Sequence, residues 1–344
     1  MKISHNFKFA IFGRILYTDH FIRELHKNGF PKPVVIVSSD EEYKRDKKIL
    51  APLGLYGDLE KLEKEGLCEL YKFSNVNNSS VVDLLSEKKC NIGISINCRD
   101  IINEKIINFF NNKIFNIHDS YLPNERGGAL NSWRILNGIN SVGNTIHFLE
   151  KDIDSGPIVL RKHSDINKVN PLPIDYLKTE VKNCEFLLTK FCNILANNGK
   201  IPSLLQNNNK SFYFPRLYTK LNGAINWDWD VSEIERFIRA FSHPYEGAYT
   251  YYRDTKIHIL NAHIEENSNL VFHPFCNGKI ITNLDNGNVR VVAGKSSLII
   301  TEITKNGKGH NPPNKEISVK YTLYSKQEDL IMSRSFVPST NKMK

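Results

Sequence analysis

The sequence predicts an α/β protein in which a doubly wound, parallel-rich sheet is followed by a small antiparallel β domain. Two observations predict this fold class. Apolar strands alternate with amphipathic helical segments through the first half of the chain, and short strands separated by turn residues follow one another from about residue 249. The length of 344 residues corresponds to roughly two domains. An apolar content of 40% is ordinary for a chain that folds around a core.

The alternation begins with a strand, a helix and a second strand. Residues 7–13 and 33–39 are apolar runs typical of buried strands. Between them, residues 18–29 have the apolar spacing of an amphipathic helix, with Thr18 as the predicted N-cap and Gly29 as the glycine that ends it. A unit of this kind closes right-handed into a parallel sheet.

Further segments continue the alternation towards the middle of the chain. They are predicted as helix, strand, helix and strand over residues 80–90, 91–97, 104–112 and 113–120. The last of these strands is the most informative, because open α/β sheets bind ligands at the carboxyl ends of their strands.

The second half of the chain differs in kind. A helix over residues 177–196 is followed by a polar segment, residues 197–211, whose Asn, Gly, Pro and Ser content predicts a linker. Another helix is predicted over 232–244. Short strands follow, separated by turn signals such as Asp-Asn-Gly, over residues 247–253, 256–264, 278–284, 288–294 and 296–303. We therefore expect domains over 1–210 and 211–332 and a flexible tail over 333–344.

Charge and cysteine content limit the partners. Lys and Arg exceed Asp and Glu by nine, which favours anionic partners such as nucleic acid, acidic lipid or a phosphorylated small molecule. No apolar run approaches the roughly 20 residues that span a bilayer, and the apolar core of the opening residues 1–14 is too short for a secretory signal, so we expect a cytoplasmic protein. The six cysteines are scattered without a C-x-x-C pair, which favours reduced structural thiols over a metal site.

Three polar side chains are the candidate catalytic residues. Asn116 and His118 lie two apart in a predicted strand, so they project from one face, and Asp154 lies in a turn-forming stretch after the predicted strand 145–149. Transfer of an acyl group to an amine requires a base, a donor for the developing oxyanion and stabilisation of the charged base. We assign these roles to His118, Asn116 and Asp154 in that order.

The motifs around these residues carry a family resemblance. They are Asn116-x-His118, Ser120-x-Leu122-Pro123, Arg126-Gly127, Trp133, Gly143-x-Thr145-x-His147 and Asp154-x-Gly156-x-Ile158. This set, with the separation of His118 from Asp154, resembles the formyltransferases that use N10-formyltetrahydrofolate. The resemblance implies a Rossmann-like catalytic domain followed by a small, OB-like antiparallel domain. It also implies that Asn116, His118 and Asp154 form the catalytic triad and that no metal is used.

Residues 128–138, 212–229 and 244–252 further resemble the bacterial nucleotide-sugar N-formyltransferases. This implies transfer of a formyl group to the amine of a nucleotide-linked amino-deoxy sugar, with dTDP-4-amino-4,6-dideoxyglucose as the expected acceptor, for lipopolysaccharide or O-antigen biosynthesis. It also implies a homodimer, and no nucleic-acid partner or membrane insertion is expected. Tyr121 and Leu130 depart from the residues usual in relatives, so the shape of the acceptor site is expected to differ.

The resemblance also suggests where the two substrates bind. The pterin of the folate is expected on the backbone of residues 95–102, although a strand followed by a helix-capping Asp100 is compatible with the same residues. The expected folate contacts are Ser95, Asn97, Cys98, Arg99, Ile101 and Asp152. A nucleotide diphosphate needs cations and an aromatic platform, and the expected acceptor contacts are Arg14, Tyr121, Arg126, Tyr213, Phe214 and Arg216. Trp133, Trp227 and Trp229 are interpreted as packing residues.

Other functions remain open. Methionyl-tRNA formyltransferases share the triad and a carboxy-terminal barrel, and an RNA partner would suit the basic charge, but the predicted linker contains more asparagine than lysine. A hydrolase that passes the formyl group to water would use the same triad. A binding module without catalysis is disfavoured because the triad is complete.

Overall fold

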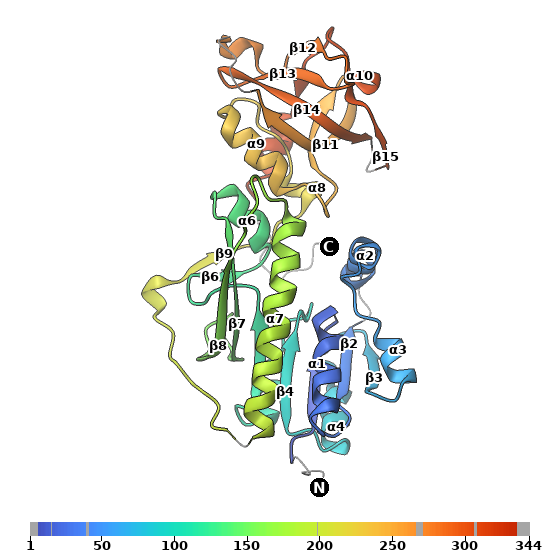
Figure 1. Ribbon diagram of the computed structural model, residues 1–344, viewed down its shortest axis with the longest axis vertical. Helices are drawn as coiled ribbons and strands as arrows, with labels where there is room; N and C mark the ends of the chain where they lie inside the picture. Colours follow the sequence, from blue (N-terminus) through green and yellow to red (C-terminus); the bar gives the residue numbers. More distant parts are fainter. Residues whose placement is uncertain are drawn as a thin grey trace. The chain divides into compact units, whose positions relative to one another are not determined.

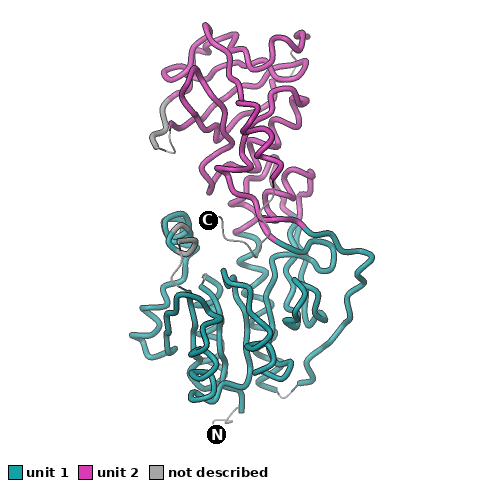
Figure 2. Tube along the Cα trace, turned by 180° about the vertical axis from the view of Figure 1, so that it is seen from behind, with its two compact units in different colours: residues 1–127, 142–165, 178–213 teal, residues 128–141, 166–177, 214–344 magenta. Residues whose placement is uncertain are grey.

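The computed structural model describes residues 6–14, 16–38, 41–197, 199–265, 271–305 and 308–335. The chain forms two compact units, which Figure 2 distinguishes by colour. Unit 1 contains Met1–Gly127, Val142–Asp165 and Lys178–Tyr213, and unit 2 contains Gly128–Ser141, Ile166–Leu177 and Phe214–Lys344. The last crossing between the units falls close to the boundary expected near residue 210. Two short segments that precede that boundary in the sequence belong to unit 2.

Unit 1 is built on a sheet with the strand order β3-β2-β1-β4-β5-β7-β8 (Figure 1). Its strands are β1 (Phe9–Phe12), β2 (Val34–Ser38), β3 (Glu69–Phe73), β4 (Ile92–Ile96), β5 (Ile114–His118), β7 (Ser141–Phe148) and β8 (Ile158–Asp165). The pairs from β3 to β5 are parallel, and β7 runs antiparallel to β5. The prediction of a parallel-rich α/β sheet is confirmed.

Helices cover both faces of this sheet because successive strand residues point to opposite faces and both sets are apolar. On one face, Phe9 packs edge-on against Phe21, with ring centroids 5.4 Å apart. On the other face, Phe12 packs against Phe110 at 6.3 Å. The covering helices are α1 (Leu16–Lys27) and α7 (Pro173–Ala196) on the first face, and α4 (Ser79–Glu87) and α5 (Glu104–Phe109) on the second. Two shorter helices, α2 (Glu41–Leu50) and α3 (Leu59–Lys64), also belong to unit 1.

Two residues considered as helix caps, Thr18 and Asp100, do not cap helices in the structure. Helix α1 begins at Leu16, so Thr18 is a buried residue inside its first turn and is not the N-cap. The C-terminal glycine is confirmed, since Gly29 has a positive φ of 79° and its N–H donates to the carbonyl of His26. Helix α5 is capped by Asn103, whose side chain accepts from the N–H of Ile106, and not by Asp100.

Unit 2 is an antiparallel sheet with helices packed on it, as predicted for the second half of the chain. The sheet order is β12-β13-β14-β11-β10-β16, with β15 paired to β14. The strands are β10 (Ala248–Tyr252), β11 (Thr255–Ile264), β12 (Ile280–Asn283), β13 (Val289–Ala293), β14 (Ser296–Lys305), β15 (Lys308–Asn311) and β16 (Leu323–Tyr324). The predicted Asp-Asn-Gly turn joins β12 to β13, with Gly287 at a φ of 91°.

The helices of unit 2 come from both halves of the sequence. They are α6 (Leu130–Leu136), α8 (Thr219–Asn222), α9 (Val231–Ala240), α10 (Pro313–Glu316) and α11 (Gln327–Met332). Helix α6 packs on α9, where the hydroxyl of Ser132 donates to the carbonyl of Ala240 at 2.7 Å. The tail predicted from residue 333 lies outside the described residues from residue 336 onwards. Before that point, the carbonyl of Ser333 accepts from the side chain of Asn222.

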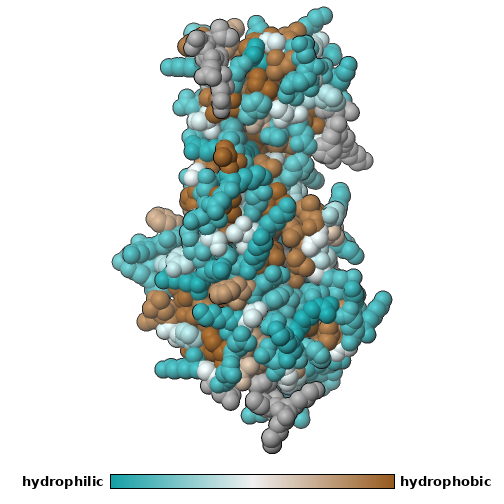
Figure 3. All heavy atoms as spheres, viewed as in Figure 1, coloured by the Kyte–Doolittle hydropathy of each residue, from teal (hydrophilic) through white to brown (hydrophobic). Residues whose placement is uncertain are grey.

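The face of the molecule in Figure 3 has mostly hydrophilic side chains with hydrophobic patches between them. Among the described residues, no helix is both long enough and apolar enough to cross a membrane. The six cysteines form no disulfide among the described residues, and Cys68, Cys90, Cys184 and Cys192 are buried. This agrees with the prediction of reduced structural thiols.

Candidate active site

Strand β5 positions Asn116 and His118 at the carboxyl end of the sheet of unit 1. The strand is parallel to β4, and its register places Asn116 beside Ser95 and Ile117 beside Ile96. The apolar residues before Asn116 are fully buried in the core of unit 1, whereas Asn116 is half-buried where the core ends. The alternation of a strand then puts His118 on the same face as Asn116.

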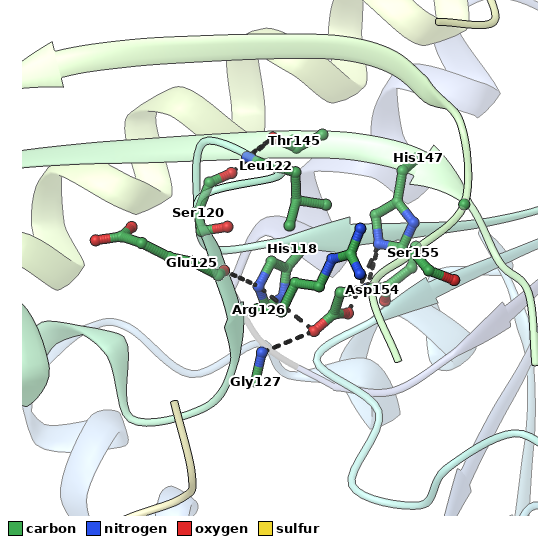
Figure 4. Close-up of polar contacts among 12 residues, drawn as sticks. His118, Ser120, Leu122, Glu125, Arg126, Gly127, Thr145, His147, Asp154 and Ser155 are labelled. Atoms are coloured by element: carbon green, nitrogen blue, oxygen red, sulfur yellow. Dashed lines mark hydrogen bonds and ion pairs between the residues drawn. The ribbon is translucent and has the colours of Figure 1, made fainter. Parts of the chain in front are cut away.

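Asp154 reaches the same place from the turn between β7 and β8. One carboxylate oxygen, Oδ2, accepts a hydrogen bond from the N–H of Gly127 at 3.0 Å and lies 3.6 Å from Nε2 of His118. The other, Oδ1, lies 3.8 Å from Nε2 of His147. Figure 4 shows His118, His147 and the Gly127 N–H directed at this carboxylate. The structure therefore brings the three predicted catalytic residues together, although Asp154 is distant in the sequence from Asn116 and His118.

The direct hydrogen-bond partner of His118 was not predicted from the sequence. Nε2 of His118 lies 3.0 Å from the carbonyl oxygen of Glu125. A carbonyl oxygen only accepts, so Nε2 must carry a hydrogen, and in the neutral imidazole the lone pair is on Nδ1. The carboxylate of Asp154 lies beyond hydrogen-bond distance of the same nitrogen, where it acts on the ring through its charge.

His147 holds Asn116 in a fixed orientation. Burial, partly opposed by the charge of Asp154, lowers the pKa of His147 to about 4, so the ring is neutral near pH 7. Its Nδ1 lies 2.8 Å from the carbonyl of Phe148 and must donate, which leaves Nε2 to accept from Nδ2 of Asn116 at 3.1 Å. The second N–H of Asn116 remains for another acceptor. His147 belongs to the motifs noted in the sequence, but no role was assigned to it there.

The segment expected to hold the pterin begins beside Asn116, because Ser95 is the register partner of Asn116. After Ser95, which is buried, Asn97 has a φ of 53° and the chain is irregular up to α5. The carboxylate of Asp100 fixes this segment by accepting from Asn75 Nδ2 and the N–H of Val76, both at 3.0 Å. An irregular backbone at a strand end, adjacent to the candidate catalytic side chains, leaves main-chain donors and acceptors available to a flat ring.

The side chains of the expected folate contacts have different surroundings. Arg99 forms an ion pair with Asp46 of α2, and Cys98 is partly buried. Ile101 is exposed and available to pack on a ring. Asp152 is exposed in the β7–β8 turn, where its carbonyl accepts from the hydroxyl of Ser155. The folate roles of these residues remain predictions.

The basic residues expected to bind acceptor phosphate already have protein partners. Arg14 makes a two-pronged ion pair with Glu60, and although burial opposes the shift, hydrogen bonds from Arg14 and Lys72 lower the pKa of Glu60 to about 2. Nη2 of Arg126 donates to side-chain oxygens of Gln206 and Asn208 at 2.9 and 2.8 Å. Phosphate binding by Arg14 or Arg126 would therefore compete with these contacts.

The expected aromatic contacts lie in both units. Tyr121 is in unit 1, where the guanidinium of Arg161 lies 4.3 Å from its ring centre. Tyr121 packs so closely on Gly143 that a Cβ there would lie 2.3 Å from the Tyr121 Cβ. Tyr213 lies on β9 (Phe212–Phe214), which pairs with β6 (Glu125–Gly127), and is exposed.

In unit 2, the expected contacts Phe214 and Arg216 lie near residues of the 128–141 segment. The ring of Phe214 packs on Trp133, and Arg216 lies against Gly128. The indole N–H of Trp133 donates to the carbonyl of Pro215, and that of Trp227 donates to Thr250. Trp229 packs on Phe237, so each tryptophan has the packing contacts predicted for it. Among the described residues, no cluster of His, Cys, Asp or Glu side chains could hold a metal ion.

The sheet of unit 1, the meeting of Asn116, His118 and Asp154, and the antiparallel unit 2 define the class of the protein. The chain belongs to the formyl transferase family: residues 5–183 match the family model described as formyl transferase, and residues 218–315 match the model of the formyl transferase C-terminal domain. The expected family resemblance and the enzyme class are confirmed at this level.

Curated relatives share parts of the chain. The bifunctional polymyxin resistance protein ArnA of Wigglesworthia glossinidia brevipalpis is 32% identical over 190 residues, which is 55% of this chain but only 29% of that protein. A methionyl-tRNA formyltransferase of Syntrophomonas wolfei is 26% identical over 259 residues, or 74% of this chain and 79% of the relative. The chain therefore spans less than a third of the length of ArnA.

Solved structures resemble this one over most of its length. WlaRD, a sugar 3N-formyl transferase solved with dTDP and 5-N-formyl-THF, has a TM-score of 0.61 at 23% identity, covering 89% of this chain and all of its own. An N-formyltransferase from Helicobacter canadensis, solved with folinic acid and dTDP-3-aminofucose, has a TM-score of 0.62 at 20% identity, covering 86% of this chain and 98% of its own. These similarities show the shared fold.

Proposed function

We propose that this protein transfers the formyl group of N10-formyltetrahydrofolate to the amine of a nucleotide-linked amino-deoxy sugar. The observation that carries the proposal is the meeting of Asn116, His118 and Asp154 at the carboxyl end of β5. The acceptor class is supported by the solved relatives, two of which hold a formyl-folate compound together with dTDP or a dTDP-amino sugar. Both of these relatives are covered almost completely by the present chain.

The geometry gives each of the three side chains one task. Formyl-folate, when bound, supplies the formyl group at the end of β5. The acceptor amine must lose a proton as it attacks, and Nδ1 of His118 is the nitrogen with a free lone pair because Nε2 donates to Glu125. The N–H of Asn116 that His147 does not use can donate to the formyl oxygen as negative charge develops there. The carboxylate of Asp154, 3.6 Å from His118, stabilises the ring once it is protonated. The protonated His118 then returns this proton to the leaving folate nitrogen, as the bond between that nitrogen and the formyl carbon breaks.

Methionyl-tRNA is the second candidate acceptor. A methionyl-tRNA formyltransferase is 26% identical to this chain over 74% of its residues, and the formal charge of +9 would suit an RNA partner. The sugar nucleotide is favoured because two solved sugar formyltransferases are covered almost end to end. Water is the third candidate acceptor, since the same three side chains would serve a hydrolase.

A single panel of acceptors distinguishes these functions. The protein would be incubated with formyl-folate and, separately, with dTDP-, UDP- and GDP-linked amino sugars, with methionyl-tRNA and with buffer alone. We expect the mass of one formyl group to be added to an amino-sugar nucleotide and not to the tRNA. Formylation of methionyl-tRNA alone, or release of formate in buffer alone at the same rate, would contradict the proposal.

The finer assignment is the position of the amine. We propose dTDP-4-amino-4,6-dideoxyglucose as the acceptor, for lipopolysaccharide or O-antigen synthesis. A 4-N formyltransferase of Francisella tularensis is among the similar structures, with a TM-score of 0.53 at 19% identity. The 3-amino isomer is the comparison in the panel, because one relative is named a sugar 3N-formyl transferase and the other was solved with dTDP-3-aminofucose. We also propose that the protein forms a homodimer. A measurement of its mass in solution would test this proposal.

A further inference from the structure

The polar segment predicted as a linker is attached to the turn that carries Asp154. Leu204 forms a bridge with Ile158 at the start of β8: the N–H of Ile158 donates to the carbonyl of Leu204 at 2.8 Å, and the reverse bond is 2.9 Å. An antiparallel bridge at this pair places Gln206 beside Gly156, two residues after Asp154. Within the described residues 202–210, Gln206 is half-buried whereas its neighbours are exposed.

The amide of Gln206 is engaged at both ends. Nε2 donates to the carbonyl oxygens of Asp154 and Gly156 at 2.8 and 2.7 Å. Oε1 accepts from Nη2 of Arg126 at 2.9 Å. Because the carbonyls only accept and the guanidinium only donates, the orientation of the amide is fixed by its partners. Both hydrogens of the Gln206 amide nitrogen are therefore directed at the backbone on either side of Ser155.

The turn that Gln206 holds is conformationally demanding. Asp154 has a φ of 53°, in the left-handed region that residues with a Cβ adopt only when their surroundings enforce it. Gly156 is packed so closely that a Cβ there would lie 1.9 Å from the carbonyl oxygen of Phe148. The hydrogen bonds from Gln206 thus fall on the two backbone positions of the turn where the chain has least freedom.

We propose that Gln206 is a positioning residue that sets the carboxylate of Asp154 for catalysis, and that Arg126 belongs to this support. The proposal rests on the proposed function, because it explains how Asp154 is held for the role that formyl transfer assigns to it. The carboxylate of Asp154 must lie between His118 and His147 while accepting from Gly127, and a small rotation of the turn would break this arrangement. The backbone carbonyl held by Gln206 belongs to the same residue as that carboxylate.

This proposal changes the interpretation of Arg126. The sequence suggested that Arg126 binds acceptor phosphate, but its Nη2 donates to Gln206 and to Asn208. The two hydrogens of that nitrogen are used by these contacts. The guanidinium therefore orients Gln206, and Gln206 then holds the backbone turn at Asp154.

The first experiment compares Gln206→Ala and Gln206→Glu with Leu205→Ala, a control at an exposed neighbouring position. Glutamate has the size of glutamine but places an oxygen against the two carbonyls. We expect both Gln206 variants to lower kcat by about 10- to 100-fold, since a displacement of about 1 Å can cost that much. The KM values of both substrates should change less than about 2-fold, because a positioning residue acts on the reaction step and not on substrate binding.

The outcomes that overturn the proposal are specific. Wild-type kcat in Gln206→Glu would show that donation to the carbonyls is unimportant. A raised KM for the acceptor with unchanged kcat would make Gln206 a substrate contact. In an Asp154→Asn background, Gln206→Ala should lower kcat by less than about 2-fold, because residues that act as a unit are not additive. A full additional loss would show that Gln206 acts independently of Asp154.

A second measurement does not depend on the substrate. Hydrogen exchange of the amides of residues 152–158 should be faster in Gln206→Ala than in wild type or in Leu205→Ala, because the turn loses two hydrogen bonds. Unchanged exchange would overturn the proposed support whatever the enzyme formylates. If exchange changes as expected but no amino-sugar nucleotide is formylated, the proposed function fails and the support at Asp154 stands.

Discussion

His118 and His147 show how position changes the chemistry of one side chain. Their ring centres are 6.3 Å apart, and both rings lie near the carboxylate of Asp154. His147 is enclosed and its two nitrogens are committed to Phe148 and Asn116, so it serves as a neutral support. In His118, Nε2 donates to the carbonyl of Glu125, so in the neutral ring the lone pair that can accept a proton is on Nδ1.

Replacement of His118 should remove the base without disturbing the fold. We expect His118→Asn to lower kcat by about 10²–10⁴-fold, the usual contribution of general base catalysis. The urea midpoint of unfolding should stay close to that of wild type, because His118 makes one hydrogen bond at the edge of the core. Steady-state kinetics and urea titration check the two expectations. Near-wild-type kcat would exclude His118 as the base.

His147 should make the stability of unit 1 depend on pH. Its pKa is about 4 in the folded protein and about 6.5 when unfolded, so the unfolded state binds more protons as the pH falls. The free energy of unfolding should therefore decrease between about pH 6.5 and about pH 4, by up to about 3 kcal/mol from this group. Below about pH 4 this contribution changes no further.

Urea titrations of wild type and His147→Gln at several pH values measure this contribution. The variant should be less stable near pH 7, because the shape and contacts of the buried ring are lost, but its stability should fall less steeply towards pH 4. His258, whose pKa is also lowered by burial, is present in both proteins and cancels in the comparison. Parallel curves would show that His147 does not contribute the slope.

At the scale of elements, the loop after β4 connects local packing to the proposed folate site. Asp100 is buried, and its carboxylate accepts from Asn75 and from the backbone of Val76. These bonds tie the segment after Ser95 to the residues that precede α4. The backbone expected to face the pterin is thus held by a side chain that need not touch the folate.

Asp100→Asn should weaken folate binding because an N–H would replace one of the two acceptor oxygens. We expect the KM for formyl-folate to rise by about 10-fold, which corresponds to about 1.4 kcal/mol, with the KM for the acceptor unchanged. Asn103→Ala, which removes the cap of α5, is the control that lowers stability by about 1 kcal/mol without this effect on KM. Equal changes in both KM values would contradict a folate-specific role.

The elements of unit 1 were predictable because their patterns are local. Apolar runs and helical spacing predicted β1, β2, β4 and β5 and the helices α1, α4 and α5, and the Asn116-x-His118 spacing predicted one face of β5. The partners from Glu125 and Gln206 were not predictable. The first is a backbone carbonyl, which has no residue signature, and the second lies in a segment whose composition is that of a linker. The bridge from Leu204 to Ile158 and the hydrogen bonds of Gln206 bring that segment to the site.

At the scale of the whole molecule, the two compact units are not continuous segments of the sequence. The segment Gly128–Ser141 belongs to unit 2, although it lies between two strands of the sheet of unit 1. Its helix α6 packs on α9, which begins some 95 residues after α6 ends by the sequence numbering. An amphipathic helix has the same pattern whichever unit covers it, so a boundary near residue 210 was the natural expectation from composition.

A fragment of residues 1–210 should consequently be unstable. It retains α6 but lacks α9, so Leu130 and Ile135, both buried in the full chain, lose cover, and Ser132 loses the carbonyl of Ala240. Burial of one such aliphatic side chain contributes about 1.5–3 kcal/mol. We expect the fragment to unfold at lower urea than the full chain and to bind a hydrophobic dye.

The dye binding has a matched control in the same fragment. Leu130→Ser and Ile135→Ser, made together, replace two apolar side chains of α6 that are buried in the full chain, so the doubly substituted fragment should bind less dye than the unsubstituted one. The same pair in the full chain should lower the urea midpoint, because there the two side chains are in the core. Less dye binding in the substituted fragment, together with a lower urea midpoint in the substituted full chain, would establish that α6 depends on unit 2. If the fragment unfolds at the same urea concentration as the full chain and binds no dye, residues 1–210 fold independently and the domain boundary lies near residue 210.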